Sequence, residues 1–482
     1  MGGAASGWQA IAAAALVALG GCTVGPNYQR PTAPLTASYK ELKGWKRAEP
    51  ADTLDRGPWW AAFRDPVLDR LEERVAVDNQ TIKAAAAAYA QARALVHETQ
   101  AGLFPVIGGN GNLQRQRSRG LISTTATVEG TASWDLDLWG RIRRQVEGQA
   151  AAAQASAADL ANARLSAQAQ LATLYFELRY QDALERLLAD TVSAFRRSLQ
   201  ITKNQYAAGI VGQSDVITAQ TQLDGAQAEL VDAGVARAKF EHAIAVLVGV
   251  PPAALSLAKR PVTARLPRTP VGVPSALLER RPDIAAAERT MQAENAAIGA
   301  AVAAFFPDVN LSAAIGAAGS PPLFTASNAL WTLAASGAET LFEGGARTAA
   351  VAAASAAYQE SVANYRQAVL TAFQDVEDQL ATLRILTREA SVRERAARDA
   401  RQAVQIALNE YQAGTTAYTT VVQAQATALT AQQAALAVQE NRHVAAVGLI
   451  QALGGGWTTA ELPPMKRLRK PSLSLPALRG SM

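Results

Sequence analysis

An internal duplication limits the fold of this 482-residue chain more than any other feature of its sequence. Four short motifs occur twice, 202 to 205 residues apart: Phe104-Pro105 and Phe306-Pro307, Leu138-Trp139-Gly140 and Leu341-Phe342-Glu343-Gly344, Leu178-Arg179 and Leu383-Arg384, and Tyr206-Ala207-Ala208-Gly209 and Tyr411-Gln412-Ala413-Gly414. This period is far longer than the repeat unit of a solenoid protein. The chain therefore consists of two related halves, which should fold in the same way.

Each half predicts a hairpin of long helices. An alanine-rich helix, 67–102 or 275–304, ends before a Phe-Pro pair, because proline disfavours helical geometry in the residue before it. Further on, each half has about 70 residues without proline, ending at Gly209 or Gly414, which makes a helix about 100 Å long. Helices of about half that length, 213–249 and 418–453, should return alongside. A returning helix and the helix ahead of the strands together match one long helix.

The first long helix carries a coiled-coil pattern. Most of its large apolar residues keep one heptad register, which Gln181 and Glu185 interrupt: Leu171, Leu174, Leu178, Leu188, Val192, Phe195 and Leu199. A sustained heptad predicts that long helices pack side by side.

Each half also predicts two β-strands between its helices. Apolar and polar residues alternate strictly over 124–136, which gives a strand one apolar and one polar face. The segments 308–317 and 330–337 repeat this alternation more weakly, and 105–117 shows it least. Strands of about ten residues with alternating faces suit a transmembrane β-barrel, but four strands cannot close one. Because every backbone polar group must be paired in lipid, other copies would have to meet the free edges. The alternative is a soluble coiled-coil rod whose loops never enter a bilayer.

The single cysteine, Cys22, follows a signal-like segment. Residues 8–19 are apolar, too few to span a bilayer and typical of a signal-peptide core. They end in Leu19-Gly20-Gly21-Cys22, small residues before a cysteine that would be lipidated; the alternative is a chance cysteine behind an ordinary signal peptide. Residues 1–21 carry no Lys or Arg, which is unusual for a secretory signal and leaves the translation start open. We expect a signal peptide over 1–21.

The domain order follows from the repeat and from the charge distribution. We expect a lipid-anchored N-terminal arm and equatorial segment over 22–64 and a first repeat over 65–250. An equatorial linker over 251–274 should follow, then a second repeat over 275–456 and a basic tail over 457–482. The tail carries five of the basic residues against Glu461 and supplies most of the formal net charge of +5. A short Pro-containing tail is no nucleic-acid surface, so no nucleic-acid partner is predicted.

Several motifs match a known family. They are Gly21-Cys22-Thr23-Val24-Gly25-Pro26-Asn27-Tyr28 with Pro31 and Pro34, Trp59-Trp60 with Phe63 and Asp65-Pro66-Val67-Leu68, Glu279-Arg280-Arg281-Pro282-Asp283-Ile284 with Ala287-Glu288, Ala303-Ala304-Phe305-Phe306-Pro307, and the two Tyr-x-x-Gly turns. With them the chain resembles the TolC-like outer-membrane factors over nearly its whole length. The resemblance is to the NodT-type lipoprotein branch, which serves resistance-nodulation-division efflux pumps.

The resemblance implies a mainly α-helical fold with a membrane β-barrel. Duplicated long-helix hairpins of a homotrimer would form an α-barrel tunnel, and four strands per chain would contribute to a twelve-stranded barrel. An equatorial region around its waist would take in the N-terminal arm, the linker and the C-terminal segment. The protein would sit in outer-membrane lipid, extend into the periplasm, and join a periplasmic adaptor protein and an inner-membrane proton-driven efflux pump.

The resemblance also assigns roles near the two turns. Adaptors would dock at the hairpin tips around Gly209 and Gly414. Family members narrow the tunnel just past the second turn, often with a ring of acids, but Thr420 and Gln423 stand at those positions. Only Asp215, at the matching place in the first half, carries a charge. We therefore expect an aperture closed by packing and neutral hydrogen bonds through Tyr418, Val422 and Gln423, with Thr420 and Asp215 beside them. Asp215 facing outward, as a helix cap or adaptor contact, is the alternative.

The sequence offers no catalytic or metal-binding pattern, so we predict neither an enzyme nor a cofactor. His97-Glu98 begins like a zinc-protease helix, but Ala101 replaces the second ligand. The leading hypothesis is passive conduction of drugs or other small solutes from periplasm to exterior. A coiled-coil adaptor or scaffold is a second hypothesis, but an adaptor would carry a lipoyl-like β domain where this chain has a duplicated helical body. A hydrolase is a third hypothesis, disfavoured because the sequence shows no catalytic site. Among channels, a type I protein-secretion or heavy-metal export system is the alternative.

Overall fold

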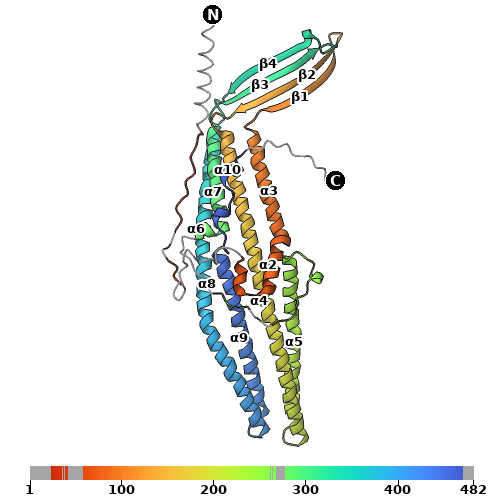
Figure 1. Ribbon diagram of the computed structural model, residues 1–482, viewed down its shortest axis with the longest axis vertical. Coiled ribbons are helices and arrows are strands. Elements are labelled where there is room, and N and C mark those ends of the chain that lie inside the picture. Colours follow the sequence, from red (N-terminus) through yellow and green to blue (C-terminus); the bar gives the residue numbers. More distant parts are fainter. Residues whose placement is uncertain are drawn as a thin grey trace.

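The computed structural model describes residues 23–34, 36, 38–41, 58–260, 262, 264–267 and 277–470. The molecule is a long rod with a four-stranded sheet at one end and helices over the rest of its length (Figure 1). Within the part of the chain that is described, no helix is both long and apolar enough to cross a bilayer. Cys22 and the predicted signal segment lie outside the described residues.

The sheet contains the four predicted strands. They are β1 (Val106–Ser118), β2 (Leu121–Leu136), β3 (Asp308–Gly319) and β4 (Ala329–Ala338). All neighbours are antiparallel and their order follows the sequence, so β1 and β4 form the edges. The segment 124–136, in which apolar and polar residues alternate, lies in β2. This strand is in the middle of the sheet, between β1 from the first half of the chain and β3 from the second half.

The duplicated helices have equal lengths in the two halves. Helices α4 (Arg141–Ala207) and α8 (Ala346–Gln412) have 67 residues each, and α5 (Gln213–Leu247) and α9 (Tyr418–Ala452) have 35 each. Helices α3 (Gln80–Ala101) and α7 (Pro282–Ala303), which precede the strands, have 22 each. The predicted long hairpins are therefore confirmed.

The helices ahead of the strands are broken, and the single helices expected over 67–102 and 275–304 were wrong. Asn79 has extended backbone angles between α2 (Pro66–Asp78) and α3, and its side chain caps α3 by accepting from the Ile82 amide at 3.0 Å. Arg281 is extended between α6 (Leu277–Arg280) and α7 because Pro282 follows it.

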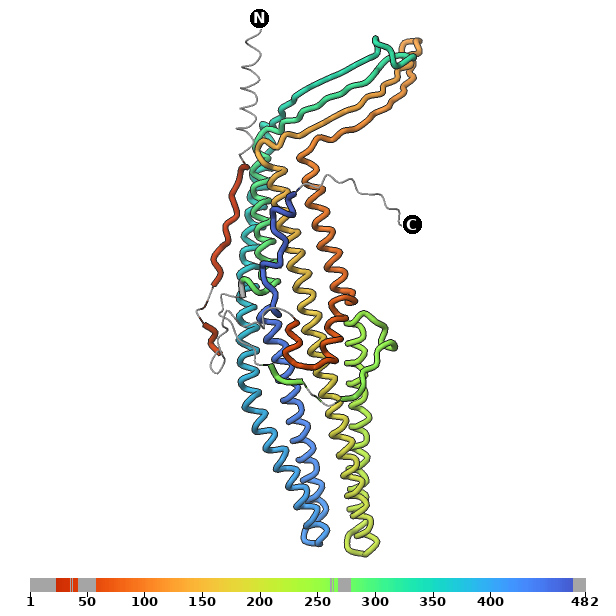
Figure 2. Tube along the Cα trace, viewed as in Figure 1, coloured from red at the N-terminus to blue at the C-terminus, as the bar shows by residue number. Residues whose placement is uncertain are grey.

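Each broken helix continues a returning helix, as the lengths predicted. The side-chain amide of Asn79 donates to the Leu247 carbonyl at 2.9 Å, so α3 begins where α5 ends. The Arg281 guanidinium donates to the Ala452 carbonyl at 3.3 Å, so α7 begins where α9 ends. Figure 2 shows the resulting continuous rods beside α4 and α8. A main core lies near these junctions, where Phe63 packs on Phe176 with ring centroids 4.9 Å apart. All heptad residues of α4 named above are buried except Leu174, which is half-buried.

The N-terminal and C-terminal segments that the structure describes both reach the region of the rod next to the sheet. The amide of Val24 donates to the Trp139 carbonyl at 3.1 Å, just below β2. The C-terminal segment includes α10 (Met465–Leu468), and the side-chain amide of Gln100 donates to the Leu468 carbonyl at 3.2 Å. Because Gln100 is at the end of α3 next to β1, this segment lies near the sheet. Its first residues lie at the junction where α9 ends, since Trp457 packs on Ala285 at the start of α7. The expectation that the segment belongs to the waist stays a prediction.

Candidate aperture and docking tips

The two hairpin turns have the same backbone geometry. Each long helix ends in a glycine with positive φ, +72° at Gly209 and +75° at Gly414. The Gly209 amide donates to the Tyr206 carbonyl at 2.9 Å, and the Gly414 amide donates to the Tyr411 carbonyl at 3.1 Å. This left-handed closure satisfies the last carbonyls of a helix. Both turns lie at the end of the rod opposite the sheet, where the predicted docking tips belong (Figure 1).

The side chains make the tips unequal. The first tip exposes a large apolar surface, with Ile210 63% exposed and Ile217 58% exposed, and Tyr206 is exposed as well. At the second tip Tyr411, the counterpart of Tyr206, is buried, and Thr415 follows the turn in place of Ile210. Large exposed apolar patches on a surface mark interaction sites.

Tyr418 packs between the two hairpins of one chain. It is 2% exposed, its hydroxyl lies 3.2 Å from the Ser198 hydroxyl of α4, and its ring centroid lies 5.1 Å from that of Tyr411. Burial raises the pKa of the Tyr418 hydroxyl, which therefore stays neutral. Val421, one turn along, is also fully buried. The Tyr418 side chain thus fastens α9 to α4.

The other predicted aperture positions surround this contact. Thr420 and Gln423 are exposed and Val422 is half-buried. Asp215 is half-buried in the first turn of α5, and burial, with a smaller contribution from the negative charge of Asp215, raises the pKa of Tyr418. The structure therefore places these residues in one tip region. Whether they line an aperture stays a prediction, because an aperture is formed by several copies.

A buried charge network at the middle of the rod was not predicted. Asp182 accepts from Arg179 at 2.7 Å and from Arg237 at 2.7 Å, and its side chain is 2% exposed. Arg237 also donates to the Leu257 carbonyl at 2.6 Å, and the Arg260 amide donates to Asp182 at 3.2 Å. This network fastens the linker after α5 to α4 and α5.

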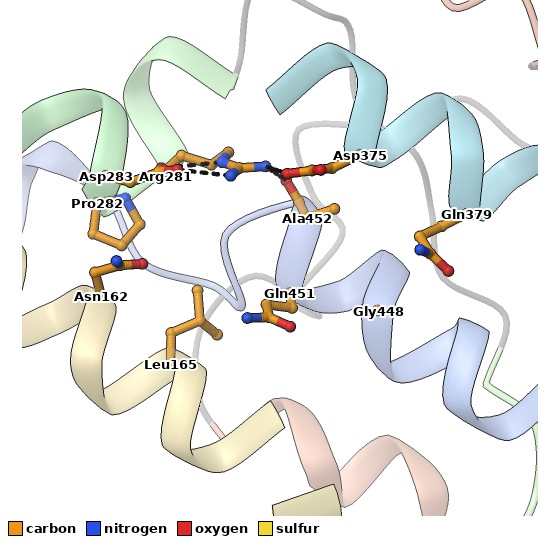
Figure 3. A pocket seen from close by; sticks show the side chains of 10 residues that line it. All are labelled: Asn162, Leu165, Arg281, Pro282, Asp283, Asp375, Gln379, Gly448, Gln451 and Ala452. Atoms are coloured by element: carbon orange, nitrogen blue, oxygen red, sulfur yellow. Dashed lines mark hydrogen bonds and ion pairs between the residues drawn. The ribbon is translucent and has the colours of Figure 1, made fainter. Parts of the chain in front are cut away.

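The Arg-Pro-Asp motif stands at a junction of three helices. Arg281 donates to Asp283 at 2.7 and 3.0 Å and to Asp375 of α8 at 3.0 Å. Burial lowers the pKa of Arg281, but its hydrogen bonds and the charges of Asp283 and Asp375 outweigh burial and raise it. Figure 3 shows these side chains at one side of a cavity of about 300 Å³. The cavity is lined by Asn162, Leu165, Arg281, Pro282, Asp283, Asp375, Gln379, Gly448, Gln451 and Ala452. The motif therefore has a structural role, joining α7 to α8 and α9.

No group of three or more His, Cys, Asp and Glu side chains among the described residues could hold a metal ion. His97 lies 3.2 Å from the Gln100 side chain within α3, and the ring of His443 is buried 2.8 Å from the Tyr180 hydroxyl. Burial lowers the pKa of His443.

Comparison with known proteins agrees with this architecture. The sequence model of the family described as outer membrane efflux protein matches residues 72–250 and 273–455. The pyoverdine export outer membrane protein OpmQ of Pseudomonas aeruginosa is 31% identical over 468 residues, covering 92% of this chain and 96% of that protein. The probable efflux pump outer membrane protein TtgC of Pseudomonas putida is 29% identical, covering 91% and 93%.

Solved structures give the same result. The outer-membrane channel OprN is similar with a TM-score of 0.85 and 29% identity, covering 90% of this chain and all of that one. The open state of the MtrE outer membrane channel of Neisseria gonorrhoeae has a TM-score of 0.82 and 28% identity, covering 90% and 98%. The chain therefore belongs to the outer membrane efflux protein family, whose members are outer-membrane channels.

Proposed function

We propose that the protein is the outer-membrane channel of a tripartite efflux system, in which three copies form a duct that conducts small solutes passively from the periplasm to the exterior. The observation that carries this proposal is one rod that joins 67-residue helices to a sheet with two unpaired edges. A helix of that length extends about 100 Å, enough to reach far into the periplasm from the outer membrane.

The unpaired edges support assembly into a homotrimer. In lipid the backbone groups of β1 and β4 need partners, which only other copies or other proteins can supply. Three copies of four strands give twelve, a barrel size within the range of outer-membrane proteins. In mild detergent we expect a stable trimer; a monodisperse monomer would contradict the proposal.

The N-terminal segment supports a lipid anchor. Val24 lies against Trp139 at the base of the sheet, and Arg144 donates to the carbonyls of Val24 and Gly25 at 3.1 Å each. Acyl chains on Cys22 would therefore reach the membrane that the strands occupy, as in the lipoprotein branch. Cys22→Ser should abolish incorporation of labelled fatty acid. Label that persists in this variant would contradict the anchor and leave the channel proposal standing.

The partners and cargo follow from the relatives. TtgC is named for an efflux pump, OpmQ for pyoverdine export, and CusC of Escherichia coli, 28% identical, for cation efflux. We propose that this chain serves a periplasmic adaptor and a proton-driven inner-membrane pump that exports drugs or similar small solutes. A heavy-metal export or type I protein-secretion system is the alternative. The identity to CusC is close to the identity to TtgC, so the sequence comparison does not separate a metal system from a drug system.

Deletion of the gene in its host tests the function. Loss of the protein should raise the intracellular accumulation of drugs and dyes, and the full-length chain should restore efflux. Accumulation of heavy-metal cations alone would favour the metal alternative, and an unchanged level of both classes would contradict efflux. Crosslinking in the cells, with the chain as bait, should then recover an adaptor.

A further inference from the structure

The four-stranded sheet has an apolar face and a polar face that continue from strand to strand. Residues paired across neighbouring strands share a face. One row of the apolar face consists of Ile107, Ala132, Ala313 and Leu333, and the next of Gly109, Gly130, Ile315 and Trp331. The polar face includes the row Gly108, Thr131, Ala314 and Thr332. In the proposed channel the apolar face contacts lipid and the polar face lines the lumen.

Three arginines gather at the far end of β1. Arg115 and Arg117 lie on the strand and Arg119 lies in the turn to β2, while β2, β3, β4 and the loop from β3 to β4 contain no Lys or Arg. Side chains alternate along a strand, so Arg115 and Arg117 share the apolar face with Leu113. All three arginines are exposed, and no hydrogen bond or ion pair joins them to another described residue.

This end of the sheet holds no acidic residue that could neutralise the arginines. Residues 111–128 and 309–338 contain neither Asp nor Glu. The nearest acid on these strands is Glu129, which pairs with Asn110 on the polar face. Asn110 is five residues before Arg115, so Glu129 is about 17 Å away along the strand. A neighbouring copy would bring the same acid-free strands and loop, so the counter-charge must come from outside the protein.

The length of β1 places the arginines at the boundary of the bilayer core. A transmembrane strand needs about 9–11 residues to cross the core. Counted from Val106 at the helical end, Arg115 is the tenth residue and Arg117 the twelfth. Because the helices lie at the other end of the sheet, this boundary belongs to the outer leaflet in the proposed channel (Figure 1). An arginine there can cover apolar surface with its stem and hold its guanidinium among the headgroups.

The turn itself gives a second, independent observation. Ser118 pairs with Leu121, and the two residues between them have positive φ, +50° at Arg119 and +84° at Gly120. Two-residue turns of this kind favour Asn or Asp before the glycine. A left-handed conformation costs a side chain such as arginine about 1–2 kcal/mol. Local folding therefore does not explain Arg119, whereas a requirement for positive charge at this end of the sheet does.

We propose that Arg115, Arg117 and Arg119 of each chain bind the phosphate of a lipid in the outer leaflet that carries phosphate monoester groups, as lipid A does. This inference rests on the proposed function, because it needs the strands in the outer membrane. Guanidinium groups donate two parallel hydrogen bonds to phosphate oxygens. Arg115 and Arg117 are about 7 Å apart along the strand, so their long side chains can converge on one phosphate.

The choice of a phosphate monoester follows from charge. Three arginines without an acid present three positive charges. A phosphate monoester carries about −1.5 to −2 at neutral pH, more than the single charge of a phosphodiester. The acyl chains of the lipid would lie along the apolar face below Arg115, beside Leu113. A lipid therefore gains contacts that free phosphate cannot make.

Lipid titration of the purified full-length protein tests this site. Native mass spectrometry in mild detergent should show one lipid A molecule bound per chain. Arg115→Gln with Arg117→Gln should weaken binding by about tenfold or more, because each change removes a charge-assisted pair of hydrogen bonds. Arg115→Lys with Arg117→Lys should weaken it severalfold, because lysine keeps the charge and loses the paired geometry.

A relocated pair of arginines is the matched control. Gln114→Arg, Arg115→Gln, Gln116→Arg and Arg117→Gln in one chain keep the composition and net charge and move both arginines to the polar face. The relocated variant should bind lipid A as weakly as the double glutamine variant. Binding equal to that of the parent would overturn the proposal, since charge at this end of the strand would then suffice on either face.

Two further probes identify the source of the phosphate. Phosphatidylglycerol, a phosphodiester, should bind about tenfold more weakly than lipid A, and inorganic phosphate in large excess should not displace bound lipid A. Equal affinity for phosphatidylglycerol would overturn the preference for a monoester. Displacement by inorganic phosphate at the affinity of lipid A would show an anion site without a lipid contact and overturn the proposal.

Failure of this site is distinguishable from failure of the channel. A parent protein that binds no lipid A while its gene still supports drug efflux overturns the lipid site and leaves the channel standing. Gene deletion that leaves accumulation unchanged contradicts the channel, whereas the lipid measurement on the purified protein stands by itself.

Discussion

The guanidinium of Arg281 donates to the carboxylate of Asp375 at 3.0 Å across the junction where α9 ends and α7 begins. Arg281 also bonds Asp283 and the Ala452 carbonyl, so a single side chain joins three helices that are distant in sequence. The sequence motif is thus explained by assembly of the rod, with no ligand required.

Arg281→Ala should therefore destabilise the rod. Its removal leaves Asp375 and Asp283 without their cation and the end of α9 without a donor, and we expect a loss of about 3 kcal/mol. Thermal or urea unfolding followed by far-ultraviolet circular dichroism measures it. Arg395→Ala, at an exposed position of α8, is the control and should change stability by less than about 0.5 kcal/mol. Equal losses of unfolding free energy in the two variants would show that the contacts of Arg281 at the junction do not stabilise the rod.

Glu72 on α2 gives the protein a pH-dependent stability. Its side chain is fully buried and neither carboxyl oxygen has a hydrogen-bond partner among the described residues. Burial, with a smaller contribution from the charge of Asp69, raises the pKa of Glu72 from 4.5 to about 9. The folded state therefore favours the protonated acid, and stability falls as pH rises from 4.5 toward 9.

Glu72→Gln removes that ionisation. The variant should match the parent at pH 5 and exceed it at pH 8 by a few kcal/mol, on the order of magnitude expected for a buried carboxyl. Urea unfolding at both pH values measures the difference. Glu73→Gln, at an exposed position of the same helix, is the control and should change the free energy of unfolding by less than about 0.5 kcal/mol. A constant difference between Glu72→Gln and the parent across this range would show that Glu72 does not titrate there.

How far the sequence predicts this structure differs between elements. The repeat and the proline-free segments predicted the hairpins and strands, because each depends on local patterns of one element. The break at Asn79 was missed because one polar residue in an alanine-rich pattern looks like a helical surface position. The contacts of Tyr418 with Ser198 and of Arg237 with Asp182 join separate helices, and no periodicity within one helix reveals which helices will be neighbours.

The first hairpin tip should be the stronger docking surface. Ile210→Asp and Ile217→Asp place charges in its exposed apolar patch and should reduce drug efflux severalfold without changing the abundance of the protein in the outer membrane. Thr415→Asp at the second tip is the matched control and should have a smaller effect. Gly209→Trp and Gly414→Trp should also reduce efflux, because the left-handed backbone costs a non-glycine residue about 1 kcal/mol and the ring blocks the tip. Unchanged drug resistance in all of these variants would remove the tips from the docking site.

The charge of Asp215 should determine what little ion preference the aperture has. Asp215 is half-buried in the first turn of α5, and the exposed residues past the second turn, Thr420 and Gln423, are neutral. Three copies of one carboxylate make a weak ring, and salt screens its field within about 8 Å at physiological ionic strength. Planar-bilayer recordings should therefore show a mild cation preference, which Asp215→Asn abolishes along with block by divalent cations. The control Asp224→Asn, farther along α5, should leave both unchanged. If Asp215→Asn also leaves cation preference and divalent block unchanged, the carboxylate faces away from the aperture, as a helix-cap or adaptor-contact residue would. Closure of the aperture would then depend on packing such as that of Tyr418 against Ser198.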